Sequence, residues 1–581
     1  MSEKPHSAID RYKARREGKV VPNLTADERL EIRSPRQKIG SGKKFTPYRR
    51  SQKRARRLLM WASFTLVTLI LLAWQSLPGH QYPIQLVYEI DLLQAPNGSL
   101  TVTMITEGKL PGKLDLEVAT GRAGNPGNGV EIHSITAFEM SDGGMQGKSL
   151  AITDLKDGWQ ISTQGTRRAV IAYRIDLSSP PESEEDIRQY ISTPVEGGIR
   201  AAGFEIFLLP TTVPVGDITV MIHNPRDLPV LVPWPALVRG VDRLDSDRDQ
   251  RSDPLDPSVQ PAHLGLGQGF QPAAKVDFPS GKIPSPGKGI AAPVPASLFF
   301  HPRDLADLNN ALIICGDIRT STVQTRDCVI QLATDQDWLF SDEAALDLIR
   351  RIARTELGFF GSAPNQQITV ILSANRVTVE TGFDVYGVHT GSSILVLMDP
   401  ETTYGMLEKQ VSSVIAHEMF HGWLGEAIRQ TDPQTLWFTE GITTWYSARM
   451  LVAAGLWAPD HGRETLLSRL ERDYVGNDLM GTISLAEAAA EVMAGPDQVR
   501  FAYAAGVAAA MSLDQWLATN SGLQRPLDEV LRHLYENYLG RELSREIIEE
   551  AIHTVTGVDC HDWLEAHVYG KTALPPLEQL I

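Results

Sequence analysis

The stretch that decides the fold reads VSSVIAHEMFHGWLGEAI and runs from Val411 to Ile428. Its apolar residues recur at helical spacing, which predicts a helix with one apolar side. His417 and His421 are four residues apart, so both imidazoles lie on one face of that helix and can reach the same ion. Zinc is typically held by such a pair together with one further protein ligand, and the fourth position is left to water.

The third ligand is expected in LWFTEGITTWYSARMLVAAGL, Leu436 to Leu456. This segment predicts a second apolar helix, from about residue 434 to 454, and a turn at residues 431–433 would fold it back against the first helix. Glu440 follows His421 after eighteen intervening residues. We therefore predict one zinc ion per chain, held by His417, His421 and Glu440. Glu418, next to the first ligand, can act as a base toward the water.

These two segments resemble the gluzincin metallopeptidases. The spacing of HEMFH and the glutamate in WFTEG is similar to that of the aminopeptidase N family, and the longer helix is similar to the glycyl aminopeptidase family. The resemblance covers roughly residues 296–520 and, more loosely, the region before them. It implies a thermolysin-like catalytic domain, with Glu440 as the third ligand, and peptides as substrates.

Two further segments carry the resemblance to the substrate side of the site. Tyr503 begins Tyr-Ala-Ala-Gly, similar to the family's Tyr-x-Lys-Gly, in which the tyrosine donates a hydrogen bond to the tetrahedral oxyanion. A family strand that binds the substrate amine through a glutamate corresponds here to YGVHTG, with Gly387 and with His389 in the place of that glutamate. The resemblance implies a catalytic role for Tyr503 and altered substrate binding at His389 and Gly387. A surface-loop histidine and a core tyrosine are the alternatives.

The charge distribution predicts a membrane anchor. The net charge is −16, and residues 1–57 hold 18 Lys or Arg against 6 Asp or Glu, so the rest of the chain totals −28. Residues 58–77 form an uncharged apolar run, long enough to cross a bilayer of about 30 Å as a helix. The basic side is expected in the cytoplasm and the body outside, as on the periplasmic face of a bacterial inner membrane. A buried core helix and a cleaved signal peptide are the alternatives, and an acidic body excludes nucleic acid as a partner.

The remaining organisation is that of a multidomain α+β protein. Residues 1–57 are expected to be a disordered basic arm, 58–77 a single transmembrane helix, and 81–233 an antiparallel β-sandwich-like domain, because short alternating runs recur there. Residues 234–295 are rich in Pro, Gly and Asp and are expected to be a linker. Residues 296–455 form the predicted catalytic domain and 456–581 a helical C-terminal part.

Two local features stay open on the sequence alone. Alternate aspartates in the linker could bind calcium, but Gln250 stands where an acidic calcium loop needs glycine, so a solvated linker is favoured; they are Asp245, Asp247, Asp249 and Asp253. Cys315 and Cys328 are flanked by strand-like segments and could form a disulfide across a hairpin, or both could be buried thiols. Cys560 is expected to be structural.

The motif favours a membrane-anchored zinc metallopeptidase that hydrolyses peptide bonds. All the residues needed for the chemistry are present, and the missing amine-binding glutamate points to changed substrates. An alternative is a catalytically silent family member that acts as an envelope binding scaffold. Another is a zinc hydrolase of a non-peptide bond, because the same activated water attacks other carbonyls.

Overall fold

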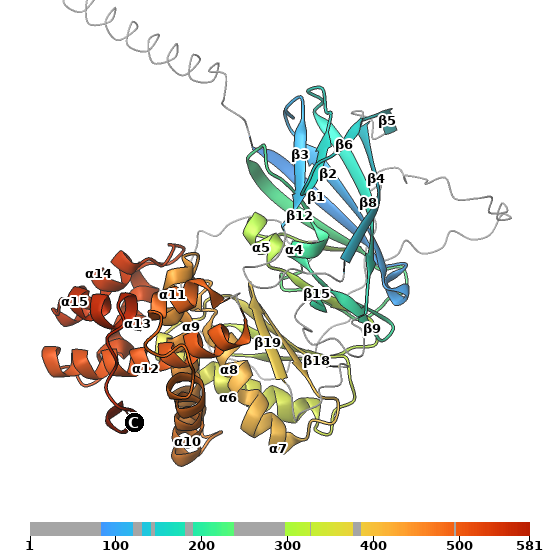
Figure 1. Cartoon of the computed structure of the whole chain (residues 1–581). Coiled ribbons are helices and arrows are strands. Elements are labelled where there is room, and N and C mark those ends of the chain that lie inside the picture. Colours follow the sequence, from blue (N-terminus) through green and yellow to red (C-terminus); the bar gives the residue numbers. More distant parts are fainter. Residues whose placement is uncertain are drawn as a thin grey trace, which may run out of the picture. The chain divides into compact units, whose positions relative to one another are not determined.

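The computed structural model describes most of one large unit of the chain (Figure 1). This unit spans Gln81–Ile581, and a smaller unit spans Met1–His80. The described residues are 83–119, 130–140, 146–179, 190–236, 297–325, 327–375, 385–492 and 495–580. The predicted arm and anchor, nearly all of the linker and its four aspartates lie outside them. Within these ranges, no helix combines the length and the apolar character needed to cross a bilayer.

The N-terminal part of this unit is built from β-sheets, as the alternating runs predict. In β1 (Ile84–Asp91) every second side chain is buried. The larger described sheet has the order β14-β12-β1-β2-β8-β4-β5. Its other strands are β2 (Ser99–Glu107), β4 (Val130–Met140), β5 (Gln146–Ser149), β8 (Arg168–Leu177), β12 (Val215–His223) and β14 (Ser297–Phe300). It shares one apolar core with a sheet of β11 (Leu208–Pro210), β3 (Leu114–Val118), β7 (Gly158–Ile161) and β6 (Ile152–Asp154).

The prediction of an antiparallel domain is wrong for one strand pair. β1 and β12 run parallel, with Leu86 opposite Ile218, whereas the other pairs of this sheet are antiparallel. Parallel neighbours require a long crossover connection. The long chain segment between the two strands provides that connection, and a pattern of alternating burial does not show strand direction.

The chain returns to these sheets after the predicted linker. β14 pairs with β12, and β15 (Leu312–Cys315) lies between β10 (Gly198–Ala202) and β13 (Val230–Leu231). A fourth strand, β9 (Thr193–Val195), completes this third sheet. The predicted start of the catalytic domain at residue 296 therefore needs correction, because the strands up to Cys315 hydrogen-bond to earlier ones.

The hairpin expected around Cys315 and Cys328 is also wrong. Cys328 directly precedes β17 (Val329–Thr334), whose hairpin partner is β16 (Arg319–Gln324), and β17 does not pair with β15. Cys315 and Cys328 are both buried free thiols, as is Cys560. Burial raises the pKa of the Cys315 thiol to about 11, so this thiol is protonated and unreactive at neutral pH.

The catalytic part has a mixed sheet in the order β16-β17-β18-β20-β19. β17, β18 (Gln367–Ala374) and β20 (Ser393–Met398) are parallel, and the edge strand β19 (Val385–Thr390) runs antiparallel to β20. α6 (Asp342–Phe360) packs its apolar face against this sheet, and the two share one hydrophobic core. The Ser341 hydroxyl accepts a hydrogen bond from the Ala344 amide at its start, and Gly361, at φ 88°, ends it.

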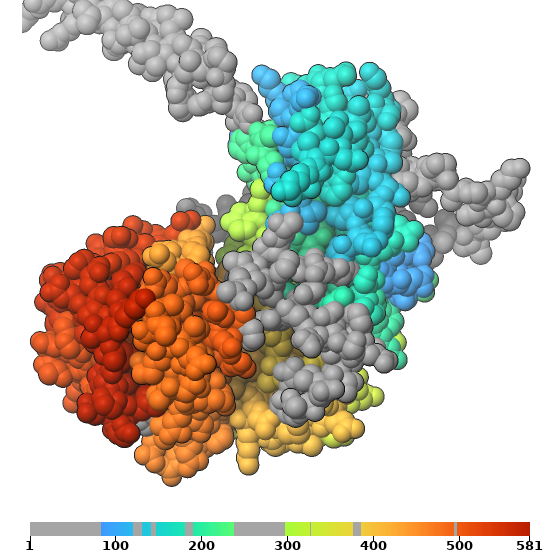
Figure 2. Space-filling model, viewed as in Figure 1, coloured from blue at the N-terminus to red at the C-terminus, as the bar shows by residue number. Residues whose placement is uncertain are grey.

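The C-terminal part is helical, and Figure 2 shows it as one continuous body in orange and red. α8 (Ser412–Phe420), α9 (Leu436–Ala453) and α12 (Pro496–Ser521) are central to the site described below. The longer helices around them are α10 (Pro459–Arg469), α13 (Pro526–Asn537) and α14 (Arg545–Thr556). The shorter ones are α7 (Tyr404–Met406), α11 (Leu485–Ala490), α15 (His561–Leu564) and α16 (Leu577–Leu580), whereas α4 (Gly203–Ile206) and α5 (Leu305–Asn309) belong to the N-terminal part.

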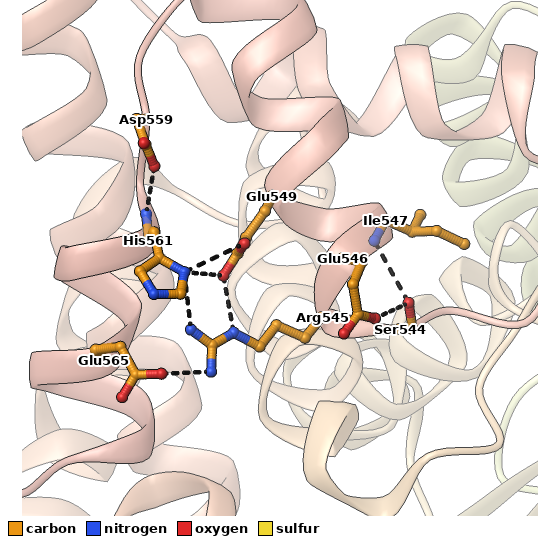
Figure 3. Close-up of polar contacts among 8 residues, drawn as sticks. All are labelled: Ser544, Arg545, Glu546, Ile547, Glu549, Asp559, His561 and Glu565. Atoms are coloured by element: carbon orange, nitrogen blue, oxygen red, sulfur yellow. Dashed lines mark hydrogen bonds and ion pairs between the residues drawn. The ribbon is translucent and has the colours of Figure 1, made fainter.

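A charged network joins α14 to α15 (Figure 3). The Arg545 guanidinium donates to Glu549 over 2.8 Å and pairs with Glu565 over 2.6 Å. The His561 ring lies 3.2 Å from the same Glu549 carboxylate. These side chains are partly exposed, so the network contributes little to the stability of the fold.

A buried arginine connects the β part to the catalytic sheet. Arg200, on β10, is 2% exposed, and its Nε donates to the Ile191 carbonyl over 2.9 Å. Its Nη1 donates to the Ser373 hydroxyl of β18, which in turn donates to Asp335. A buried guanidinium needs this full set of acceptors. These hydrogen bonds therefore fix the position of β10 relative to β18.

α9 and α12 cross at two glycines. A Cβ added at Gly441 would lie 2.2 Å from the Gly506 carbonyl carbon, and one added at Gly506 would lie 2.6 Å from the Trp437 carbonyl oxygen. The two backbones are therefore in direct contact, which side chains at these positions would prevent. This crossing sets the distance between the helix of Glu440 and the helix of Tyr503.

Gly441→Ala should destabilise the protein by about 2 kcal/mol or more, because backbone atoms must move to admit the methyl group. The urea midpoint of tryptophan fluorescence measures this, since Trp437 lies one turn away. Gly358→Ala is the matched control: Gly358 is an exposed glycine of α6 with nothing within 4 Å of its Cβ position. That change should stabilise by about 0.5–1 kcal/mol. Equal midpoints for the two variants would contradict the tight crossing.

Candidate functional site

The two histidines lie on α8, as the motif predicts. Their rings point to the same place, with Nε2 of His417 and Nε2 of His421 3.0 Å apart. α9 brings Glu440 to this point, so that its Oε2 lies 3.1 Å from His417 Nε2 and 3.4 Å from His421 Nε2. One donor atom from each residue lies within 4.8 Å of the other two, which is compact enough for one ion.

The outer nitrogens of both rings are held by the protein. His421 Nδ1 donates to the Leu424 carbonyl over 3.0 Å, and Thr444 Oγ1 lies 3.4 Å from His417 Nδ1. Such partners fix the tautomer and turn the Nε2 lone pair toward the ion. Sequence reasoning missed both partners. Thr444 could have been found, because it is four residues after Glu440 and so lies on the same face of α9.

The charges of the three groups also favour a cation. Burial penalises the charged form of Glu440, but the histidines, His421 first, outweigh this and hold the pKa of Glu440 well below its usual value. Burial also opposes a charge on His421, and yet Glu440 and then Glu418 raise the pKa of His421 to about 9. A site that stabilises positive charge and offers two imidazoles and a carboxylate fits Zn²⁺.

Glu418 is positioned by a close contact with the edge strand β19. α8, which carries Glu418, packs against this strand. A Cβ on Gly387 of that strand would lie 2.7 Å from Glu418 Cγ and 2.8 Å from its Oε1. It would also lie 2.4 Å from Val414 Cγ1. The sequence placed Gly387 on the substrate side of the site. The structure places it directly against the side chain that the motif makes the base.

Tyr503 approaches the same centre from α12. Its ring lies nearly parallel to that of His417, with centroids 6.2 Å apart. Burial raises the pKa of Tyr503 well above its usual value, and the charges of Glu440 and Glu418 and a hydrogen bond to Glu440 raise it further. Tyr503 is therefore a neutral phenol that can donate a hydrogen bond at any physiological pH.

His389 is not a surface-loop residue. It lies in β19 and is 6% exposed. A Cβ on Gly422 would lie 3.6 Å from His389 Cε1, so the ring packs against the turn that follows His421. The structure thus brings His389 beside the α8 end of the site, two residues along the strand from Gly387.

Comparison with known proteins agrees with this geometry. Residues 366–563 match the Peptidase family M1 domain. This region is therefore similar to the gluzincin domains of the aminopeptidase N type. The match includes the three metal-site residues, Glu418 and Tyr503.

Two relatives show how far the likeness extends. Aminopeptidase N of Caulobacter vibrioides is 24% identical over 136 residues, which cover 22% of this chain and 16% of that protein. The chain thus matches only about a sixth of that relative. An aminopeptidase N family protein from Idiomarina loihiensis has a TM-score of 0.61 at 16% identity, covering 85% of this chain and 78% of the other. The multidomain α+β fold, with N-terminal sheets and a helical C-terminal part, therefore resembles that of the Idiomarina protein.

Gly387→Ala should lower kcat for peptide hydrolysis by about 100-fold, because the methyl group displaces the Glu418 carboxylate by an ångström or more. Bound zinc should stay at one per chain, since none of the three metal-site residues is among the atoms nearest to the added methyl group. Gly405→Ala, whose Cβ would meet nothing nearer than 3.9 Å, is the control and should behave as the wild type. Normal turnover in Gly387→Ala would show that Glu418 is not positioned by this contact.

Proposed function

We propose that this protein is a zinc metallopeptidase that hydrolyses peptide bonds. The observation that carries the proposal is the meeting of His417, His421 and Glu440, from two helices, within 4.8 Å of one another. Glu418 and Tyr503 lie beside the same point on α8 and α12. This arrangement brings a metal, a base and an oxyanion donor to one place, which is what hydrolysis of an amide requires.

The residues divide the chemistry between them. A bound zinc ion would supply the Lewis acidity that polarises the substrate carbonyl and makes a water a stronger acid. Glu418 accepts the proton of the attacking water and then delivers it to the departing amine. Tyr503 donates its hydroxyl proton in a hydrogen bond to the carbonyl oxygen as that atom becomes negative. Because that charge exists only in the transition state, the bond accelerates the reaction.

Substrate binding is expected to differ from that of an aminopeptidase that holds a free amine through a glutamate. By the resemblance in sequence, His389 stands in the place of that glutamate, and a neutral imidazole does not neutralise an ammonium group. We therefore expect an endopeptidase, or an exopeptidase with altered substrate selection. A catalytically silent scaffold is not favoured, because all five residues of the chemistry converge.

The anchoring of the protein is a separate proposal that rests on the sequence. The uncharged run at 58–77 and the basic arm before it support a single-pass membrane protein with a cytoplasmic N-terminus. The catalytic body would then lie outside, where its negative charge keeps it soluble. Partners are expected to be peptides and, through residues 58–77, the lipid bilayer.

Glu418→Gln should reduce kcat by at least 1,000-fold while zinc binding is retained, because glutamine fills the same volume but cannot accept the proton. Zinc is measured by mass spectrometry of the full-length protein and turnover with a fluorogenic peptide library.

His421→Ala is the complementary variant, and it should lose both zinc and activity. Removal of zinc from the wild type with a chelator should abolish turnover, and added zinc should restore it. Full zinc content in His421→Ala, or normal turnover in Glu418→Gln, would refute the proposed function.

A further inference from the structure

A cleft between four helices lies on the face of α9 opposite Glu440. Residues of α6, α9, α10 and α13 line it, and its volume is about 530 Å³. On α9 these residues include Arg449, which follows Glu440 by nine positions. Nine residues make about two and a half turns of a helix, so the two side chains leave opposite faces of α9. The cleft is therefore separate from the proposed catalytic centre.

Most of the residues that line this cleft are apolar. They include Phe359 of α6, Met450 and Val452 of α9, and Leu466 of α10. A Cβ added at Gly462, which also lines the cleft, would lie 3.0 Å from Val452 Cγ2, so α10 rests directly on α9. This contact fixes the two walls relative to each other. A preformed, mainly apolar cleft of this size is typical of a binding site for a small molecule.

The charged residues that line the cleft carry a net positive charge. They are Arg449, Arg463, Arg525 and Asp528, which are three cations and one anion. The chain beyond residue 57, in contrast, has a total charge of −28. A local excess of positive charge beside an apolar surface attracts an anionic ligand and repels a cationic one.

Two of the three arginines are available to a ligand. The Arg449 guanidinium donates to both carboxylate oxygens of Asp528, over 2.8 and 3.1 Å, so this pair is neutral as a unit. Arg463 and Arg525 are exposed, and neither forms a hydrogen bond or an ion pair with another residue of the described ranges. Each offers a planar fork of N–H donors that matches a carboxylate or a phosphate.

The walls of this cleft do not suit a peptide. They are the sides of helices, whose backbone N–H and C=O groups are bonded within each helix. A peptide in the cleft would exchange hydrogen bonds to water for an apolar surface, which is unfavourable for its backbone. A compact apolar body has no such polar groups to satisfy.

We propose that this cleft binds a small molecule with an apolar body and one anionic group. The body would lie against Phe359 and Met450, and Arg463 and Arg525 would hold the anionic group. A carboxylate and a phosphate both have this chemistry. The site goes beyond the proposed peptidase function and does not depend on it.

The test measures the binding of matched probes to the full-length protein. The probes are phenylbutyrate, phenylbutyl phosphate, phenylbutanol and phenylbutylamine, and NMR titrations of the probe signals give the dissociation constants. At least one anionic probe should bind about tenfold more tightly than the alcohol, as expected for a charge-assisted hydrogen bond, and the amine should bind more weakly than the alcohol. The tighter of the two anionic probes identifies the anionic group. Equal affinities for the anionic and the neutral probes would refute the proposal.

Arg463→Gln combined with Arg525→Gln should lower the affinity for the preferred anionic probe to that for the alcohol, and leave the affinity for the alcohol unchanged. Ala453→Phe, at an exposed position that lines the cleft, should weaken the binding of every probe about tenfold or more, because its ring covers apolar surface that the probe would bury. Arg354→Gln is the matched control and should bind as the wild type, since Arg354 is an exposed arginine of α6 that does not line the cleft. A preference for the anionic probe that survives the loss of both arginines would overturn the proposal.

Removal of zinc separates this cleft from the proposed catalytic site, because a carboxylate or a phosphate also binds metal ions. The chelator-treated protein and the Glu418→Gln variant should bind the preferred probe with the affinity of the wild type. Binding that is lost together with the metal would place the probe at the metal site and contradict the proposal. Binding that is retained and depends on the two arginines supports the cleft, even if no peptide is hydrolysed.

Discussion

The structure depends on one local constraint, which is that three donor atoms from two helices must share one point. The Nε2 atoms of His417 and His421 lie 3.0 Å apart, and Glu440 Oε2 lies 3.1 Å from the first. Two imidazoles and a buried carboxylate at these separations are stable only with positive charge among them. The requirements of this point explain why α8, α9 and α12 pack so closely.

Glycine makes this packing possible at the places where a side chain would interfere. Gly441 and Gly506 let α9 and α12 touch, so Glu440 and Tyr503 can act on one centre. Gly387 does the same for β19 and the Glu418 side chain. In each case the absence of a Cβ allows a close approach in the folded protein. The cost is that glycine loses more conformational freedom on folding than other residues do. The catalytic groups thus come from separate segments, and a glycine allows each of these close approaches.

Charge is distributed unevenly around this centre. The body is acidic overall, and its buried acids Glu440 and Glu418 raise the pKa of Tyr503 and of His421. Arg449 and Arg472 are neutralised by aspartates.

The sequence by itself determined the helices of the site and the residues they carry. Helical periodicity and the four-residue spacing place His417 and His421 on one face whatever the rest of the chain does, because the helix repeat is fixed. The spacing to Glu440 and the turn before α9 were enough to expect a third ligand. The alternation of apolar and polar residues likewise predicted the sheets between residues 81 and 233.

Only the tertiary structure decided contacts between segments distant in the chain. The parallel pairing of β1 with β12 and the return of β15 to the N-terminal sheets leave no local signal in the sequence. The periodicity of apolar residues shows which side chains are buried, but not which strand lies next to which. The same holds for the cysteines, whose strands pair with other partners.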